Sequence, residues 1–261
     1  METFTLHRGT APLLISLPHD GSEIPPALAA RMTPPAQRAP DTDWFVSRLY
    51  DFGRALGASM LVPRYSRYVV DLNRPPDDVS LYPGQNTTGL CPIVQFSGEA
   101  VYLEGQLPDE KEIAGRIETF WRPYHAALEG ELRRLRAEHE RVLLWEGHSI
   151  RGRLPFLFDG QLPDFNLGTV NGASCAPRMQ AAMEAVLGAQ SDYSWISNGR
   201  FKGGYNTRHY GQTAAGIDAV QLELVQRNYM DEDAVSYDPS VAQPTQALII
   251  ELVRAALSAL T

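Results

Sequence analysis

Cysteine and clusters of basic residues are scarce in this 261-residue sequence, and each scarcity excludes a class of protein. The only cysteines are Cys91 and Cys175, so neither a disulfide framework nor a cysteine-built zinc site can form. This usage favours a reducing compartment, most simply the cytoplasm. The net charge is −8, and no run of lysine and arginine occurs. Because nucleic-acid binding depends on basic clusters, we expect no nucleic-acid partner.

Long apolar runs are also absent. No run approaches the roughly 20 residues that cross a bilayer, and the N-terminal residues lack the basic start and apolar stretch of a signal peptide. We therefore expect neither a membrane protein nor a conventionally secreted one. The length and the 44% content of hydrophobic residues suit a single α/β domain over 1–261 that folds without disulfides or a structural metal.

Apolar periodicity predicts strands that alternate with helices. The predicted strands are 12–19, 58–62, 68–72, 142–145 and 219–225. One predicted helix starts at 41–43 and presents an apolar face through 56. A second covers 112–140, and Pro123 should kink or divide it. Two more cover 177–187 and 239–260. The predicted loops are 24–40, 75–108, 149–169 and 198–211. This alternation predicts a three-layer α/β fold, with a mainly parallel or mixed sheet and helices on both faces.

Several polar residues directly follow predicted strands. His19, the pair Asn73-Arg74, and His148 all lie near the C-terminal end of a predicted strand. In open α/β sheets, ligands bind beyond the carboxyl ends of the strands. These residues are therefore candidates for a functional site. His125, in contrast, lies in the long helical pattern, which predicts a partly exposed helix residue.

Two histidines at strand ends favour a metal site over hydrogen-bonded loop histidines, because neutral imidazole is a common metal ligand. A catalytic zinc usually has three protein ligands and one open position. Four acids are candidates for the third ligand: Glu23, Asp41, Asp43 and Glu146. Glu146 precedes His148 by two residues on the same strand face. It is therefore better suited to orient the imidazole of His148 than to bind the metal itself.

Glu223 interrupts an apolar strand, on the same face as Gln221. A carboxylate is almost never buried without a partner, so Glu223 is either half of a structural ion pair or a general base. Cationic side chains also gather near the strand ends, which favours an anionic ligand over scattered surface charges. They are Arg67, Arg74, Arg200, Lys202 and Arg208.

Two alternatives of other classes stay open. The run Gly147-His148-Ser149 begins like the nucleophile elbow of a serine hydrolase. That pattern requires a glycine where Arg151 stands, and His209 is the only histidine downstream. A non-catalytic module that binds an anion, with structural histidines, is the second alternative.

Eight short motifs in order resemble the N-formylglutamate amidohydrolase family. They are SLPHDG at 16–21, PDTDW at 40–44, YSRYVVDLNR at 65–74, WEGHSI at 145–150, FDG with LPDFNLG within 158–168, RFKGG at 200–204, TRHYG at 207–211 and VQLEL at 220–224. Each motif is weak alone, but eight in this order are specific. The family in turn resembles the zinc carboxypeptidases and aspartoacylases.

The resemblance implies a zinc-carboxypeptidase-like fold. It also implies zinc-dependent hydrolysis of N-formyl-L-glutamate, a small anionic acyl amino acid, to formate and L-glutamate in histidine degradation. One Zn²⁺ per chain, or another divalent metal, would be held by His19, His148 and an acid. In the wider group the acid lies three residues after the first histidine, where this sequence has Ser22. We favour Asp43 over Glu23, because Asp43 belongs to a motif of the family.

The resemblance also implies roles for the remaining candidates. Glu223 is the expected general base, and Arg67 is expected to stabilise the oxyanion. Asn73 and Arg74 would bind one substrate carboxylate. The second carboxylate would be bound by Arg208, or by Arg200 with Lys202. A related zinc amidase that acts on another N-acyl amino acid is the alternative within the same fold.

Overall fold

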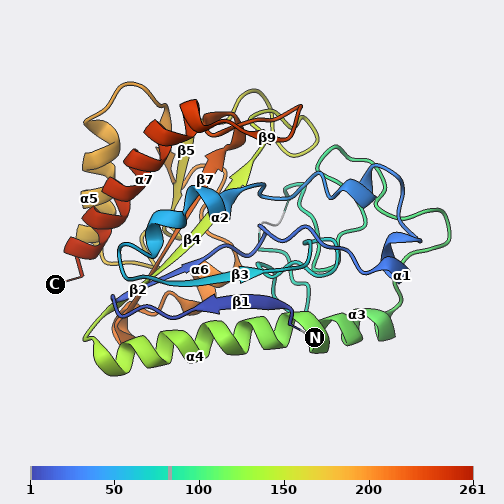
Figure 1. Ribbon diagram of the computed structural model, residues 1–261, viewed down its shortest axis with the longest axis horizontal. Coiled ribbons are helices and arrows are strands. Elements are labelled where there is room, and N and C mark those ends of the chain that lie inside the picture. Colours follow the sequence, from blue (N-terminus) through green and yellow to red (C-terminus); the bar gives the residue numbers. More distant parts are fainter. Residues whose placement is uncertain (1, 82–83, 261) are drawn as a thin grey trace.

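A seven-stranded mixed sheet lies at the centre of the protein, in the order β1-β3-β2-β4-β7-β5-β6 (Figure 1). The computed structural model describes residues 2–81 and 84–260. The strands are β1 (Phe4–His7), β2 (Leu13–Ser16), β3 (Ser59–Pro63), β4 (Val142–Ile150), β5 (Phe165–Gly168), β6 (Trp195–Ser197) and β7 (Ile217–Val225). The central strands β3, β2, β4 and β7 run parallel, whereas β1 and β5 run antiparallel to their neighbours β3 and β7. The predicted mixed sheet is confirmed.

Helices cover both faces of this sheet (Figure 1). One face packs against α2 (Val46–Leu49), α5 (Pro177–Gly188) and α7 (Pro239–Ser258), and the other against α4 (Arg122–Glu138) and α6 (Tyr205–Tyr210). Side chains alternate along β4, so that Leu143 and Trp145 join the first apolar cluster, and Leu144 joins the second. The predicted three layers are therefore present.

The long helical pattern at 112–140 forms one nearly continuous rod. It begins as α3 (Glu110–Arg116), passes through the π-helical turn η3 (Ile117–Trp121), and continues as α4. Pro123 is the second residue of α4 and directly follows the π turn, where the regular α-helical hydrogen-bond ladder is already interrupted. The helix is therefore not divided at Pro123, and the irregularity is the π turn that precedes it.

The helix predicted from 41–43 is much shorter than expected. Only Val46–Leu49 forms α2, and a separate turn, η2, covers Asp51–Gly53. Phe45 has φ 62°, in the left-handed region that bulky residues rarely adopt, and this turn separates α2 from the preceding acids. Asp43 consequently caps no helix, and its carboxylate is turned toward the histidines instead.

The predicted strand at 68–72 is wrong. This segment is buried but pairs with no strand of the sheet. Its carbonyl groups accept hydrogen bonds from helix side chains: Arg116 donates to Tyr68 and Val69, and His125 contacts Leu72. The run of β-branched residues matches a strand, yet tertiary contacts override that preference.

Three of the four predicted loops contain regular structure. The range 149–169 includes β5, whose polar Asn166 and terminal Gly168 hide its strand character, and the range 198–211 includes α6. The 24–40 loop holds two short turns, α1 (Pro26–Ala29) and η1 (Ala36–Arg38). The 75–108 loop shows no helix or strand at its described positions, and its residues 82 and 83 lie outside the described part.

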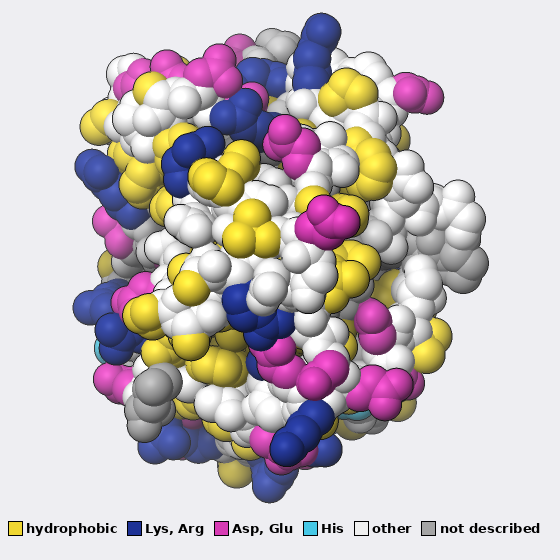
Figure 2. All heavy atoms as spheres, turned by 90° about the vertical axis from the view of Figure 1, so that its right-hand side faces the viewer, with side chains coloured by type: hydrophobic (Ala, Val, Ile, Leu, Met, Phe, Trp, Pro, Cys, Tyr) yellow, Lys and Arg dark blue, Asp and Glu magenta, His cyan; other side chains and the backbone are white. Residues whose placement is uncertain are grey.

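The other predicted elements are confirmed. They are β2, β3, α5, β7 and α7, together with β4, which extends through Ile150. A small ribbon of β8 (Met230–Asp231) and β9 (Ser236–Tyr237) lies outside the main sheet. Among the described residues, no helix has the length and apolar character needed to cross a membrane. Figure 2 shows acidic and basic side chains interspersed on the face that carries the loops near α1.

The packing of α4 on the sheet gives a direct test of stability. Leu128 is fully buried in the second apolar cluster, so Leu128→Ala should lower the free energy of unfolding by about 2–5 kcal/mol. Leu107→Ala serves as the control, because Leu107 is 58% exposed and should change stability by about 0.5 kcal/mol or less. Urea unfolding measures both. Equal losses in the two variants would contradict this packing.

Candidate active site

A pocket opens at the C-terminal edge of the parallel strands. His19 lies three residues beyond β2, while His148 and Glu223 face each other as Cα partners on β4 and β7. Parallel strands present their carboxyl ends at one edge, so three segments that are distant in sequence meet there. The side chains that line this pocket and enter the argument are His19, Asp43, Arg67, Asn73, Arg74, Thr88, His148, Ser149, Arg200, Gln221 and Glu223.

His19, Asp43 and His148 form a possible metal-binding site. Each offers one ligand atom, and these atoms all lie within 4.8 Å of one another. Oδ2 of Asp43 lies 3.1 Å from Nδ1 of His148 and 3.7 Å from Nδ1 of His19. All three side chains are buried. Two imidazoles and one carboxylate form a ligand set typical of catalytic zinc, so the residues fit a divalent metal.

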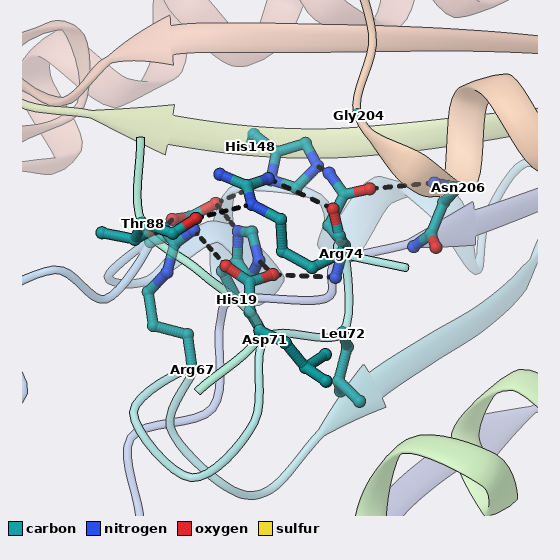
Figure 3. A network of polar contacts seen from close by, with 12 residues as sticks. His19, Arg67, Asp71, Leu72, Arg74, Thr88, His148, Gly204 and Asn206 are labelled. Carbon is teal, nitrogen blue, oxygen red and sulfur yellow. Dashed lines mark hydrogen bonds and ion pairs between the residues drawn. The ribbon is translucent and has the colours of Figure 1, made fainter. Parts of the chain in front are cut away.

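The far nitrogen of each imidazole has its own partner (Figure 3). Nε2 of His19 lies 2.7 Å from Oδ1 of Asp71. Nε2 of His148 lies 3.1 Å from Nδ2 of Asn73 and 3.7 Å from the buried carboxylate of Glu146. An acceptor such as Asp71 fixes the ring orientation of a metal-binding histidine, whereas Nδ2 of Asn73 is a donor toward His148, and both Nδ1 atoms face Asp43.

The charges in this cluster compensate one another. Burial raises the pKa of Asp43, but hydrogen bonds and charge from His148 and His19 outweigh it, and the pKa lies below its ordinary value. Burial likewise acts against ionisation of Asp71, yet the charges of His19 and Arg67 hold its pKa well below the usual range. Both carboxylates are therefore anionic at neutral pH, as ligation and orientation require.

Glu223 has the opposite shift. Burial and the nearby charge of Asp43 raise the pKa of Glu223 to about 8. Its Oε2 accepts a 3.4 Å hydrogen bond from Gln221, whose own Oε1 accepts one from the backbone N–H of Gly204. A cation between His19, Asp43 and His148 would offset the charge of Asp43 and bring this pKa closer to neutrality. A carboxylate with such a pKa can both accept and return a proton.

Arg67 lies beside the acids. Its Nη2 donates to Oδ2 of Asp71 at 2.7 Å, and its guanidinium lies 4.7 Å from the centre of the Phe96 ring. Nε of Arg67 is buried and has no hydrogen-bond partner in the described part of the chain. A buried, unpaired donor is costly, and the Arg67 side chain is one of those that line the pocket.

The remaining predicted cations divide into two groups. Arg74 and Arg200 line the pocket, whereas Lys202 and Arg208 do not. Nε of Arg208 donates to the carbonyl of Gly203. The choice between Arg208 and the pair Arg200 with Lys202 for the second carboxylate stays a prediction, and of these three only Arg200 is among the described residues that line the pocket.

Asn73 also lies in the pocket, but its amide is engaged by the protein. Nδ2 contacts His148, and Oδ1 accepts a 2.9 Å hydrogen bond from the backbone N–H of Asn206 (Figure 3). A side chain at position 204 would collide with this amide, since a Cβ there would lie 2.3 Å from Nδ2 of Asn73. Gly204 therefore permits the contact, and Asn73 holds protein groups in place.

Glu23, the rival for the third ligand, lies away from the cluster. Its carboxylate pairs with Arg64 at 2.7 Å, and both side chains are about half exposed, at 51% and 52%. Sequence reasoning missed the roles of Asp71 and Thr88. The motif DLNR contains Asp71 and could have indicated it, whereas no local signal marks Thr88, a buried pocket residue.

The fold and the pocket define an α/β protein with a possible metal site at the edge of its sheet. The sequence model for the family described as N-formylglutamate amidohydrolase matches residues 11–230. The chain therefore belongs to the N-formylglutamate amidohydrolase family. Two relatives named N-formylglutamate deformylase are 49% identical, in Pseudomonas putida, and 51% identical, in Pseudomonas aeruginosa. Each alignment covers 98% of this chain, and 96% and 97% of the respective relative.

Solved structures show the same fold. An N-formylglutamate amidohydrolase from Ralstonia eutropha superposes with a TM-score of 0.83 at 23% identity, over 98% of each chain. The gene product Atu2144 from Agrobacterium tumefaciens gives a TM-score of 0.71 at 19% identity, over 98% of this chain and 96% of its own.

The choice between Asp43 and Glu23 can be tested by metal affinity. Asp43→Ala removes one of the three clustered donors, so its metal affinity should fall by more than the roughly 10- to 100-fold that loss of an outer partner costs. Glu23→Ala removes a half-exposed acid and should leave affinity unchanged. Competition with a chromophoric chelator measures both. Retained affinity in the first variant and loss in the second would reverse the assignment.

Proposed function

We propose that this chain hydrolyses N-formyl-L-glutamate to formate and L-glutamate, with a divalent metal, zinc foremost, held by His19, Asp43 and His148. The observation that carries the proposal is the meeting of these three donors with Glu223 in one arginine-lined pocket. The two deformylases that are about half identical over nearly the whole chain support the choice of substrate.

The metal and the general base have separate roles. A divalent ion in this site supplies a Lewis acid and lowers the pKa of water. The carboxylate of Glu223 accepts a proton from the attacking water as its oxygen bonds to the formyl carbon. The bond between the formyl carbon and nitrogen then breaks, and Glu223 returns the proton to the leaving amine. Gln221 holds the carboxylate through its 3.4 Å hydrogen bond during both transfers.

Arg67 is the proposed donor to the developing oxyanion. Its Nη2 is tied to Asp71, which fixes the guanidinium, while its buried Nε has no partner among the described residues. A preorganised donor of this kind stabilises charge that appears only in the transition state. The side chain therefore contributes to the rate of the chemical step more than to ground-state binding.

The substrate carboxylates need separate partners. Arg74 donates through Nε to the carbonyl of Thr88 and through Nη1 to that of Asn73, which orients the guanidinium at the pocket wall. We assign one carboxylate to Arg74 and the other to Arg200, which also lines the pocket. Asn73 assists by holding His148. Lys202 and Arg208 keep no direct role in this proposal.

The finer implications of the family resemblance belong to the same proposal. They are a likeness to zinc carboxypeptidases and aspartoacylases, a place in histidine degradation, and action in the cytoplasm. The order of the site supports the first of these. An early histidine after a strand, an acid, a later histidine followed by serine, and a glutamate on a strand occur here as His19, Asp43, His148 and Glu223.

Hydrogen bonding disfavours a serine hydrolase. The hydroxyls of Ser149 and Tyr229 are 2.6 Å apart, and that of Tyr229 also lies 2.8 Å from the carbonyl of Trp44. The Tyr229 hydroxyl is the donor in both contacts, so Oγ of Ser149 accepts from Tyr229, and it also accepts from Nε2 of Gln226 at 3.4 Å. No histidine contacts Oγ of Ser149 within the described residues, so the hydroxyl lacks an activating base.

The proposed reaction is tested by formate release from N-formyl-L-glutamate. We expect activity in the purified protein, loss after chelation, and recovery when zinc is returned, because the histidine–aspartate cluster would be emptied and refilled. Formate is measured with a coupled formate dehydrogenase assay, and bound metal by elemental analysis of the same samples. N-acetyl-L-glutamate and N-acetyl-L-aspartate test the related-amidase alternative. Full activity in protein shown to be free of metal would contradict the metal requirement.

The role of Glu223 is tested separately. Glu223→Gln keeps the shape but removes the proton acceptor, so kcat should fall by about 10²–10⁴-fold while metal content stays near that of the wild type. Glu129→Gln is the matched control, since Glu129 is 61% exposed on α4 and should leave kcat unchanged. If Glu223→Gln loses the metal, Glu223 is a ligand and not the base.

A further inference from the structure

The segment 71–74 carries three side chains of the site but no regular secondary structure. Asp71 contacts His19, Asn73 contacts His148, and Arg74 lines the pocket. A buried segment of this kind cannot rely on a sheet ladder for its backbone hydrogen bonds, so other groups must satisfy its carbonyls. The groups that bind these carbonyls therefore hold the segment, and with it the side chains of the site, in place.

Two ring N–H groups bind the carbonyls on either side of Asn73. Nε1 of Trp121 donates to the carbonyl of Arg74 at 3.0 Å, and Nε2 of His125 lies 3.1 Å from the carbonyl of Leu72. Because a carbonyl only accepts, Nε2 of His125 carries the proton. The Leu72–Asn73 and Arg74–Pro75 peptide groups, which lie on either side of the Asn73–Arg74 peptide, are thus held from one helix face.

The helix brings these two rings together. Trp121 and His125 are four residues apart, so they lie on the same face, and their rings stack with centroids 3.7 Å apart at 23°. Trp121 is the last residue of the π-helical turn η3, directly before α4. Single π turns inside α-helices are frequent at functional sites, and this one adjusts the register at the residue that donates to Arg74.

The second nitrogen of His125 completes the arrangement. Tyr210, the last residue of α6, lies with its hydroxyl 2.9 Å from Nδ1 of His125 and donates to it, since Nε2 holds the ring proton. Near the start of α6, the backbone N–H of Asn206 donates to Oδ1 of Asn73 (Figure 3). Hydrogen bonds therefore link Asn73 to α6, α6 to His125 on α4, and His125 back to Leu72, the neighbour of Asn73.

His125 is also buried, which corrects the expectation of a partly exposed helix residue. Burial lowers the pKa of His125 to about 3, so the ring is neutral at physiological pH. If this position needed only an apolar side chain to fill space, a leucine would suffice. A neutral histidine adds one donor and one acceptor, and both are used.

We infer that Trp121, His125 and Tyr210 are positioning residues that fix the peptide groups before and after the Asn73–Arg74 peptide and thereby set Arg74 for the anionic end of the substrate. The inference rests on the proposed function for its substrate. None of the three contacts the metal cluster in the described structure, so they act through Arg74 and Asn73. Loss of one N–H should loosen the segment and weaken substrate binding.

The test compares two amides that each replace one nitrogen of His125. In His125→Gln the amide lies near the position of Nε2 and can still donate to Leu72, whereas in His125→Asn it lies near Nδ1 and cannot. We expect KM for N-formyl-L-glutamate to rise about three- to tenfold in His125→Asn, with kcat changed less, and to be largely restored in His125→Gln.

Trp121→Phe provides an independent variant, because it keeps an aromatic ring but removes the donor to Arg74. It should raise KM by a similar factor. Trp195→Phe is the matched control, since Trp195 is half-buried on the edge strand β6, and its KM should equal that of the wild type. Arg74→Lys gives the scale of the effect when the anion-binding group itself is altered.

Hydrogen exchange gives a readout that does not depend on the substrate. The backbone amides of 71–74 should exchange faster in His125→Asn and Trp121→Phe than in the wild type, His125→Gln or Trp195→Phe, while metal content stays equal. If exchange and KM are both unchanged, the inference is overturned. A wild-type protein that releases no formate would refute the proposed function, and exchange would still decide whether these residues hold the segment.

Discussion

The burial of several opposite charges at one edge of the sheet is the constraint on which the rest of the structure depends. Asp43, Asp71 and Glu223 are almost fully removed from water, and an isolated buried carboxylate is very costly. His19, His148 and Arg67 compensate two of these acids and leave Glu223 with a raised pKa. The same compensation sets the protonation of each acid. Asp43 and Asp71 remain anionic, and Glu223 can exchange a proton. Every group must hold its place, because a displaced partner would leave a buried charge unpaired.

The parallel strands meet that requirement only in part. The backbone pairing of β4 with β7 fixes His148 and Glu223 opposite each other. The other members come from irregular segments after β2, before α2, and at 71–74. These segments are fixed by side chains: Asp20 receives the backbone N–H of Ser47, and Trp121 donates to Arg74. Loop residues thereby gain a rigidity that strands provide through backbone pairing.

The segment at 71–74 explains why pattern reasoning failed at one point and succeeded at others. The β-branched and apolar residues at 68–72 match the pattern of a buried strand. Helix side chains bind their carbonyl groups instead, and the local sequence gives no sign of that contact. The helix predicted from 41–43 failed for a related reason, since Asp43 turns to His148 and Phe45 takes a left-handed backbone. Both errors lie at the site, where local preference yields to tertiary demands.

The sequence by itself determined the layered α/β architecture, because strand and helix periods depend only on which positions are apolar. It also identified His19, His148 and Glu223, since polar residues that end or interrupt apolar strands stand out locally. Tertiary structure alone decided that Asp43 and not Glu23 lies with the histidines, and that His125 is buried against Leu72. These outcomes depend on how the chain turns between elements, and the hydrogen bonds that fix those turns join residues that are far apart in the sequence.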